Sequence, residues 1–416
     1  MVFVLLFMVI GKVVGAAKEI AVAAAYGTGP IMDGYVFLFN LLSWPSTIFS
    51  NVCFITLIPF LLRIKRRSPQ ELALLRREIL GTTLLFGCLI ALVVGGALSF
   101  ALSLGITGLP LRTAQLANMM LMPMLMGIPL STMAGFLAAN LMAHGKQANT
   151  LLEGVPALCI LVVVVSISSR SPTQLAWATL AGFFLQVVLL FFAQPFGERA
   201  PRPLLTWRSP SWRDLSRGIG VVLAGVALPA FTEVVDQIMV APLGAGANAT
   251  LGYANRVISL LLGLGVTTIG RALLPTLSDV GSQHATRAQR IASSWAAALF
   301  LGGVMLGFVA WLFAPWGIKA LFERGAFSPR DTADVVSVFR LGLFQLPFYF
   351  SGVVMAQLIA SRRDYRKFLY IGIINLVTKI TGNILLIPIL GVDGAMVATS
   401  IMYAIACPTL WFFARL

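Results

Sequence analysis

Charged residues are scarce throughout this chain of 416 residues. Asp, Glu, Lys and Arg make up 11% of it, whereas soluble domains usually carry about 25%. Hydrophobic residues make up 58%, which is more than a water-soluble core could bury. Because the scarcity of charge extends along the whole chain, a soluble enzyme with one membrane anchor is excluded.

Histidine, cysteine and nucleotide-binding motifs are also scarce or lacking. Two histidines lie in short polar connections, and four cysteines lie far apart within apolar runs. This arrangement indicates neither a disulfide framework nor a metal site. The chain has no Gly-Lys-Ser/Thr motif and no connection long enough for a catalytic domain. We therefore expect no ATP hydrolysis, no other enzymatic activity and no cofactor.

Long apolar runs fill the chain instead. Runs of about 20 residues cross a bilayer as helices, because a helix satisfies its own backbone hydrogen bonds in lipid. The sequence therefore predicts an all-α polytopic membrane protein with about twelve spans. Their expected ranges are 1–26, 31–62, 79–106, 114–143, 150–169, 174–194, 218–243, 250–278, 291–316, 333–361, 368–389 and 392–414.

Basic residues gather in the even-numbered connections between these spans. The first of these connections reads RIKRRSPQELALLRRE, whereas the odd-numbered connections are short and nearly uncharged, apart from a longer mixed one after the ninth span. Lys and Arg collect on the cytoplasmic side of a membrane. The pattern predicts that both termini are cytoplasmic. It also explains most of the net charge of +15 without a nucleic-acid partner.

The two halves of the chain resemble each other. Matching residues recur in the same order at near-constant offset: Gly27 with Gly244, Tyr35 with Tyr253, Pro59 with Pro275, and Glu19 with Asp236. Such repeats are common in transporters, which hold substrate between the halves. We predict two six-helix lobes related by a pseudo-two-fold axis along the membrane normal. The expected ranges are 1–194 for the first lobe, 195–217 for a basic cytoplasmic linker and 218–416 for the second lobe.

Ionisable residues inside the predicted spans are the candidates for a functional site. A charge in the bilayer is costly, so each one is a functional hypothesis by default. Cations in a cavity suit an anionic substrate, because they bind phosphate oxygens. The predicted substrate-binding cations are Lys12, Lys18 and Arg256; the candidates for switching or ion coupling are Asp33, Glu233 and Asp236; the secondary candidates are Glu19, Lys379 and Arg340.

Sequence spacing predicts some of the contacts that these residues make. Glu233 and Asp236 are three apart and share a helix face, so a nearby cation or protonation should relieve their repulsion. Glu19 follows Lys18 directly, and adjacent helical residues are not expected to face each other. Two structural alternatives stay open. Asp33 could simply cap its helix, and a buried Lys–Asp pair could serve the fold alone.

Three segments resemble the MviN/MurJ family of lipid II flippases, in the order and at the spacing of that family. They are GAAKEIAVAAAYGTGPIMDGYVFLFNLL…IFSNVCFITLIP (15–59), GYANRVISLLLGLGVTTIGRALLPTLS (252–278) and LFERGAFSPRDT (321–332). The resemblance implies membership of the multidrug/oligosaccharidyl-lipid/polysaccharide exporter superfamily. It further implies a two-lobed bundle that alternates between inward-open and outward-open states around a cationic cavity.

The family's functional residues can be located in this chain one position at a time. By the resemblance, the family's first-helix cavity arginines fall on Lys12 and Lys18, its acidic residue in the second helix on Asp33, and its eighth-helix arginine on Arg256. Ser46-Thr47 replaces an Arg-Arg pair of the second helix. The predicted helix count is also two below the family's usual number. These departures fit a divergent member.

The principal hypothesis is a flippase that moves a polyprenyl-diphosphate-linked saccharide, either lipid II or an exopolysaccharide repeat unit, across the bacterial cytoplasmic (inner) membrane by alternating access. One alternative is a cation-coupled small-molecule antiporter of the same superfamily. Another is a non-transporting scaffold for a glycan synthesis complex. The candidate partners are the lipid-linked anionic glycan, membrane lipids, a glycan polymerase or glycosyltransferases, and a coupling H⁺ or Na⁺.

Overall fold

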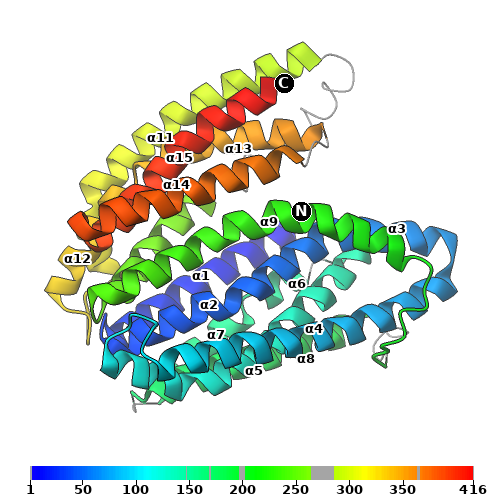
Figure 1. The fold of residues 1–416 in the computed structure, drawn as a ribbon, viewed down its shortest axis with the longest axis horizontal. Coiled ribbons are helices and arrows are strands. Elements are labelled where there is room, and N and C mark those ends of the chain that lie inside the picture. Colours follow the sequence, from blue (N-terminus) through cyan, green and yellow to red (C-terminus); the bar gives the residue numbers. More distant parts are fainter. Residues whose placement is uncertain are drawn as a thin grey trace. The chain divides into compact units, whose positions relative to one another are not determined.

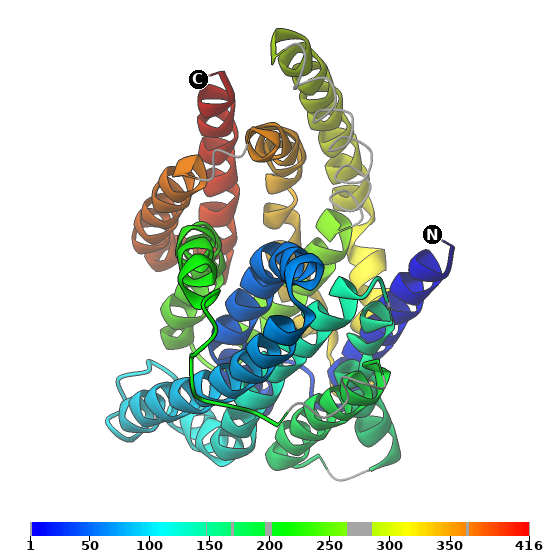
Figure 2. The ribbon, with the colours of Figure 1, turned by 90° about the vertical axis from the view of Figure 1, so that its right-hand side faces the viewer.

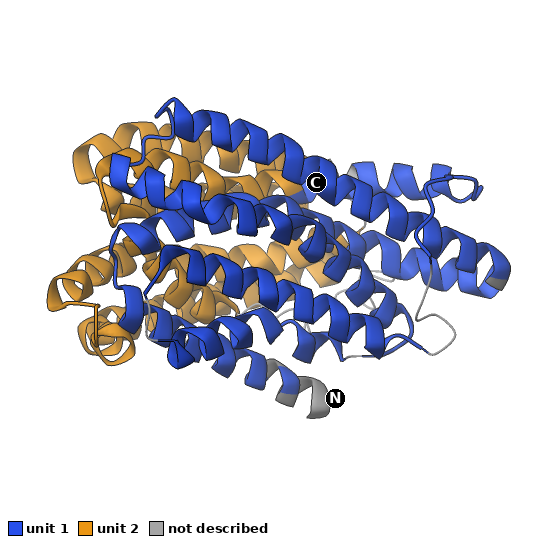
Figure 3. Ribbon diagram, turned by 90° about the horizontal axis from the view of Figure 1, so that it is seen from below, with its two compact units in different colours: residues 1–226 blue, residues 227–416 orange. Residues whose placement is uncertain are grey.

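The protein is helical throughout the part of the chain that the structure describes. This computed structural model describes residues 2–146, 148–167, 170–195, 202–263, 285–362 and 366–415. The helices form two compact units, unit 1 (Met1–Val226) and unit 2 (Ala227–Leu416), which Figure 3 colours separately. The boundary falls inside α9 (Trp212–Val240), so this helix continues from one unit into the other.

Unit 1 is a bundle of helices that vary greatly in length (Figure 1). Several begin with a proline in the first turn, where the missing N–H is not needed. Its elements before α9 are α1 (Val2–Tyr26), α2 (Pro30–Val52), the π-helical turn η1 (Cys53–Leu57), α3 (Ile58–Arg67), α4 (Pro69–Ser103), α5 (Leu111–Ala143), α6 (Asn149–Leu152), α7 (Val155–Ser166) and α8 (Pro172–Ala193).

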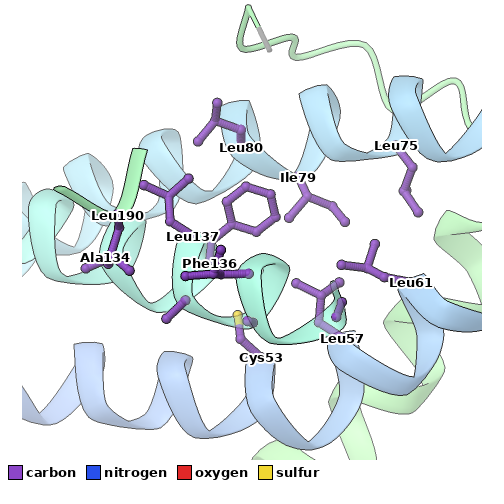
Figure 4. Close-up of a cluster of buried hydrophobic side chains, with 14 of the residues drawn as sticks. Cys53, Leu57, Leu61, Leu75, Ile79, Leu80, Ala134, Phe136, Leu137 and Leu190 are labelled. Carbon is purple, nitrogen blue, oxygen red and sulfur yellow. The ribbon is translucent and has the colours of Figure 1, made fainter. Parts of the chain in front are cut away.

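The central helix of unit 1 is α5, which packs against α2, α4 and α8. An apolar cluster surrounds its second half (Figure 4). Phe136 lies in this cluster with Leu57 and Leu61 from the end of the second span and with Leu75 and Ile79 from α4. All five are buried. The cluster therefore holds the basic ends of α3 and α4 against α5.

Residues 202–212, which lead into α9, contact α4 (Figure 2). The backbone N–H of Leu204 donates to the carbonyl of Arg77 at 3.0 Å. Gly81 makes this close approach possible, because a Cβ there would lie 2.8 Å from the carbonyl carbon of Leu204. We call residues 202–212 the strap.

Unit 2 contains the second half of α9 and the helices that follow it. Residues 247–263 form a helix at the start of a predicted span, 250–278, whose remainder lies outside the described residues together with Pro275 of the repeat. The other elements are the 3₁₀ turn η3 (Ala241–Leu243), α11 (Ala285–Phe322), α12 (Pro329–Gly342), α13 (Gln345–Ser361), α14 (Arg366–Leu390) and α15 (Val392–Arg415).

Many helices of the described chain have the length and the apolar composition of a membrane span. Nine helices are long and apolar enough to cross a membrane, and α12 with α13, bent by 43°, would make ten. The two further predicted spans are α1, which carries three charges, and 250–278, which is described only to residue 263. The prediction of an all-α polytopic membrane protein is confirmed.

Two predicted boundaries differ from the structure. The basic segment after the second span is not a loop, since α3 runs to Arg67 and α4 begins at Pro69. Only Ser68 is extended, and its hydroxyl caps α4 by accepting from the N–H of Glu71 at 3.3 Å. The predicted span 333–361 is interrupted by the bend between α12 and α13.

Two matched glycines of the predicted repeat both have positive φ. Gly27 follows α1 with φ of 58°, and Gly244 follows η3 with φ of 122°. A side chain is strained at such angles, so glycine suits both positions. This explains one matched pair of the repeat, while the two-fold relation between the halves stays a prediction.

Candidate functional site

Lys18 and Glu19 of α1 form an ion pair, and their side chains are only 15% and 17% exposed. The expectation that these neighbours do not meet is wrong. Their Cβ atoms diverge around the helix, but the flexible four-carbon stem of lysine allows its ammonium to reach the next carboxylate. Lys18 therefore has a counter-ion beside it inside the span.

Lys12 lies two turns earlier on α1 and is exposed. The backbone of α1 passes close to Gly154 here, because a Cβ at Gly154 would lie 3.4 Å from the Cα of Gly11. The Lys12 ammonium acts electrostatically on the carboxylate of Glu153, next to that contact. Lys12 thus belongs to the surface where α1 meets the start of α7.

Asp33 is fully buried in the first turn of α2. The alternative that it caps the helix does not hold, because the N-cap is Gly29 and no side chain caps this end. A carboxylate near a helix N-terminus is stabilised by the helix dipole. The helix dipole at this position therefore favours the Asp33 carboxylate at a site from which water is excluded.

Asp236 and Lys379 form a buried ion pair in unit 2, with 2.7 Å between Oδ1 and Nζ. The ammonium also donates to the carbonyl of Ala395 at 2.9 Å and to the hydroxyl of Thr399. Asn383 donates its amide to the same carboxylate oxygen at 2.8 Å. Two helices, α9 and α15, thereby place oxygen atoms around the ammonium group that α14 carries.

Helical spacing explains how this cage forms. Lys379 and Asn383 are four apart on α14, and Ala395 and Thr399 are four apart on α15, so each pair shares a helix face. A buried charge is tolerated only with a counter-charge and further hydrogen bonds. Lys379 is the nearby cation that the sequence predicted for the acidic pair. Glu233, one turn before Asp236, is exposed.

The two arginine candidates of unit 2 lie against aromatic rings. The Arg256 guanidinium is 5.5 Å from the ring centroid of Tyr253, which is fully buried. The Arg340 guanidinium is 4.4 Å from the ring of Trp311 and donates to that residue's carbonyl at 3.2 Å. Stacking of this kind fixes a planar cation.

The candidates are divided between the two units. The structure brings two pairs of them into contact, Lys18 with Glu19 and Asp236 with Lys379. Unit 1 holds Lys12, Lys18, Glu19 and Asp33, and unit 2 holds Glu233, Asp236, Arg256, Arg340 and Lys379.

Unit 1 also contains a cavity of about 500 Å³ that none of these nine residues lines. Its walls come from α2, α5 and α8, with Glu153 as the single charged residue among those that line it. We call it the unit 1 cavity. The sequence did contain a signal for it: hydroxyl side chains recur with the period of one helix face, at Ser43, Ser46, Thr47 and Ser50.

Comparison with known proteins connects the whole chain to one family. The sequence profile described as "Lipid II flippase MurJ" matches residues 22–415. A probable lipid II flippase MurJ of Vibrio cholerae is 24% identical over 452 aligned positions, covering 98% of this chain and 84% of that protein. The Bdellovibrio bacteriovorus relative is 27% identical over 59% of this chain. The match spans about half of that relative, 49%.

Solved structures show the same fold. The inward closed conformation of a lipid II flippase MurJ aligns with a TM-score of 0.86 at 16% identity, over 100% of this chain and 88% of that one. An inward-facing multidrug resistance MATE family transporter of the MOP superfamily aligns with a TM-score of 0.74, also at 16% identity, over 97% and 94%. The alignment with MurJ confirms the predicted fold class.

Proposed function

The chain belongs to the MurJ family of lipid II flippases, and from this premise we propose that it carries a polyprenyl-diphosphate-linked saccharide across the cytoplasmic membrane. The observation that supports this best is the family profile together with the half-buried cations of the spans, Lys18 and Arg256. The substrate class is lipid II or an exopolysaccharide repeat unit. Transport of this kind needs no covalent chemistry by the protein.

The cations are suited to a diphosphate. The Lys18 ammonium has three N–H donors, so it can bind a phosphate oxygen while it keeps the carboxylate of Glu19 as a partner within the span. Arg256 presents a planar guanidinium on the ring of Tyr253, which orients the fork that binds phosphate. Lys12, exposed on α1, adds positive charge near the middle of the span.

Alternating access requires that the substrate bind the two states with different affinity. We assign Asp33 to this switching, because a buried carboxylate at a helix start responds to any cation that approaches or leaves. Glu233 is exposed and remains the candidate for ion coupling. Asp236 is engaged by Lys379, so the chain itself supplies the cation that an antiporter would take from solution.

We place the protein in the bacterial inner membrane with both termini cytoplasmic. The basic ends of α3 and α4 and the strap support this orientation, since Lys and Arg are retained on the cytoplasmic side. The enzymes that supply the lipid-linked saccharide or polymerise it are the partners that such a flippase requires.

A flipping assay in proteoliposomes tests the proposal. We expect Lys18→Ala and Arg256→Ala each to lower the rate of lipid-linked saccharide transfer by at least about tenfold, because each removes a charge-assisted contact of about 1.5–3 kcal/mol. Lys65→Ala is the matched control, since Lys65 is exposed in the last turn of α3 and should leave the rate unchanged. Wild-type transfer rates in both Lys18→Ala and Arg256→Ala would overturn the assignment of these cations to substrate binding.

A further inference from the structure

We propose that the unit 1 cavity binds the saccharide part of the transported lipid through neutral hydrogen bonds and apolar ring contacts. This inference rests on the proposed function and names the part of the substrate that unit 1 recognises. Ligand cavities commonly measure about 300–1,000 Å³, and this one measures about 500 Å³.

One wall of the cavity is a row of hydroxyl groups on α2. Ser43, Ser46, Thr47 and Ser50 all line it, and their spacing of three, one and three residues keeps them on one helix face. A hydroxyl both donates and accepts, as a sugar hydroxyl does. The row therefore presents matching groups along one side of a saccharide.

The wall on α5 is built from small residues where α5 packs against α2. Gly127, Ala134 and Gly135 line the cavity there. The helices approach closely at Gly135, because a Cβ there would lie 3.2 Å from the Cα of Ser50, and Ser131 donates to the hydroxyl of Ser46 at 2.6 Å. The two helices are thus in contact at two points that border the cavity.

Two amide side chains complete the polar lining. Asn51 and Gln186 both line the cavity, the first at the end of the hydroxyl row and the second on α8. Within the described residues, neither amide group has a hydrogen-bond partner from the protein, and both remain accessible. An amide offers two donors and one acceptor oxygen. Polar groups left open in this way can discriminate strongly for a hydroxylated ligand.

Phenyl rings complete the lining. Phe39, Phe54 and Phe183 come from α2, η1 and α8 and provide flat apolar faces. A pyranose ring combines an apolar face of C–H groups with hydroxyls at its rim. Mostly apolar walls with a few well-placed polar groups match that division.

The charge of the residues that line the cavity favours binding of the saccharide over binding of the diphosphate. Among its lining residues in the described chain there is no Lys or Arg, and Glu153 is the one charged group. A phosphate placed beside that carboxylate would meet repulsion, and no cation among these lining residues would offset it. The cavity therefore suits a neutral saccharide, and the diphosphate is left to the cations of the spans.

Binding of two lipids to the purified full chain in nanodiscs tests this inference. The probes are polyprenyl diphosphate and the same lipid carrying a neutral disaccharide. We expect the wild type to bind the disaccharide lipid at least about tenfold more tightly, since two or three neutral hydrogen bonds suffice for that ratio. The variant Asn51→Leu/Gln186→Met should lose most of this preference and keep its affinity for polyprenyl diphosphate.

Two further variants complete the test. Ser103→Ala on α4 is the control, because its hydroxyl is exposed and donates only to its own helix; it should keep the preference. Thr47→Arg introduces a cation at an exposed position of the hydroxyl row, and it should tighten binding of polyprenyl diphosphate by about three- to tenfold.

The outcomes separate the two proposals. Equal wild-type affinity for both lipids would overturn the saccharide site and leave the flippase proposal standing. An unchanged preference in Asn51→Leu/Gln186→Met would overturn it too. Failure of the wild type to bind either lipid would overturn both proposals.

Discussion

Glu78 in unit 1 and Asp236 in unit 2 are both buried carboxylates, and the two are neutralised in different ways. Glu78 of α4 is 0% exposed and accepts only from neutral donors, whereas Asp236 of α9 is 6% exposed and lies against the ammonium of Lys379. Both groups avoid an unpaired buried charge. The first does so with dipoles and the second with a full counter-charge.

The donors to Glu78 come from the strap and from the residue that starts α9. The hydroxyl of Thr206 donates at 2.6 Å, the N–H groups of Arg208 and Ser209 at 2.7 and 3.2 Å, and the indole N–H of Trp212 at 2.7 Å. One carboxylate thereby holds a connecting segment that follows it by more than a hundred residues.

The difference shows what each carboxylate does for the fold. Asp236 joins three helices of unit 2 at one charged point. Glu78 instead attaches a non-helical segment to a helix. Removing the charge of Asp236 leaves another charge unpaired, while removing that of Glu78 affects only hydrogen bonds to neutral donors. The two sites should therefore respond very differently to neutral substitutions of similar size.

Asp236→Asn is expected to cause the largest loss of unfolding free energy. The Lys379 ammonium would remain buried without its counter-charge, which costs about 3–5 kcal/mol of unfolding free energy. Chemical unfolding of the purified protein in detergent measures it. Glu233→Gln, one turn away and exposed, should change the stability by less than about 0.5 kcal/mol. The double variant Asp236→Leu/Lys379→Met should recover most of the loss, and an equally unstable double variant would contradict the charge argument.

Glu78→Gln tests the neutral half of the comparison. Glutamine keeps the size of the side chain but replaces one acceptor oxygen with an NH2 group, so two of the four hydrogen bonds lose their acceptor and the other two lose the charge. We expect a loss of about 1.5–3 kcal/mol or more. Because the strap is held there, trypsin should cleave after Arg208 faster than in the wild type. Asp214→Asn serves as the control, since Asp214 is exposed in the first turn of α9 and lies outside the strap. Identical cleavage rates in wild type and Glu78→Gln would show that the carboxylate does not hold the strap.

Helix capping gives the smallest expected difference between the units. Ser328 of unit 2 forms a reciprocal capping box with Asp331, whereas Ser68 of unit 1 makes a single bond of 3.3 Å to the N–H of Glu71. We expect Ser328→Ala to cost about 1 kcal/mol and Ser68→Ala about 0.5 kcal/mol in thermal unfolding. The reverse order would show that the surroundings of each cap matter more than its own bonds.

Much of the fold could be predicted from local patterns. Apolar runs and glycine positions are properties of neighbouring residues, and the predicted spans match the described helices in order. The bend between α12 and α13 and the helical continuation through Ser68 were missed, since a span of uniform composition does not show where it bends or where a polar segment stays helical.

The candidate site was predictable only in part. The charged residues inside the predicted spans could be listed from the sequence. A cation near Asp236 was expected, but the sequence did not show that it is Lys379. The Lys18–Glu19 contact was missed, because helical spacing places Cβ atoms but not the ends of long side chains. The unit 1 cavity was missed because its walls combine residues of α2, α5 and α8. The hydroxyl row on α2 was visible, but what faces it was not.

The sequence by itself determined that this chain is an all-helical membrane protein of the MurJ family, because composition, periodicity and motif order are recorded along the chain. Only the tertiary structure decided which groups neutralise the buried carboxylates of Glu78 and Asp236. Asn383 lies 147 positions from Asp236, and Trp212 lies 134 positions from Glu78. A buried polar group takes whichever partner folding brings within about 3 Å, and spacing in sequence carries no information about contacts that distant.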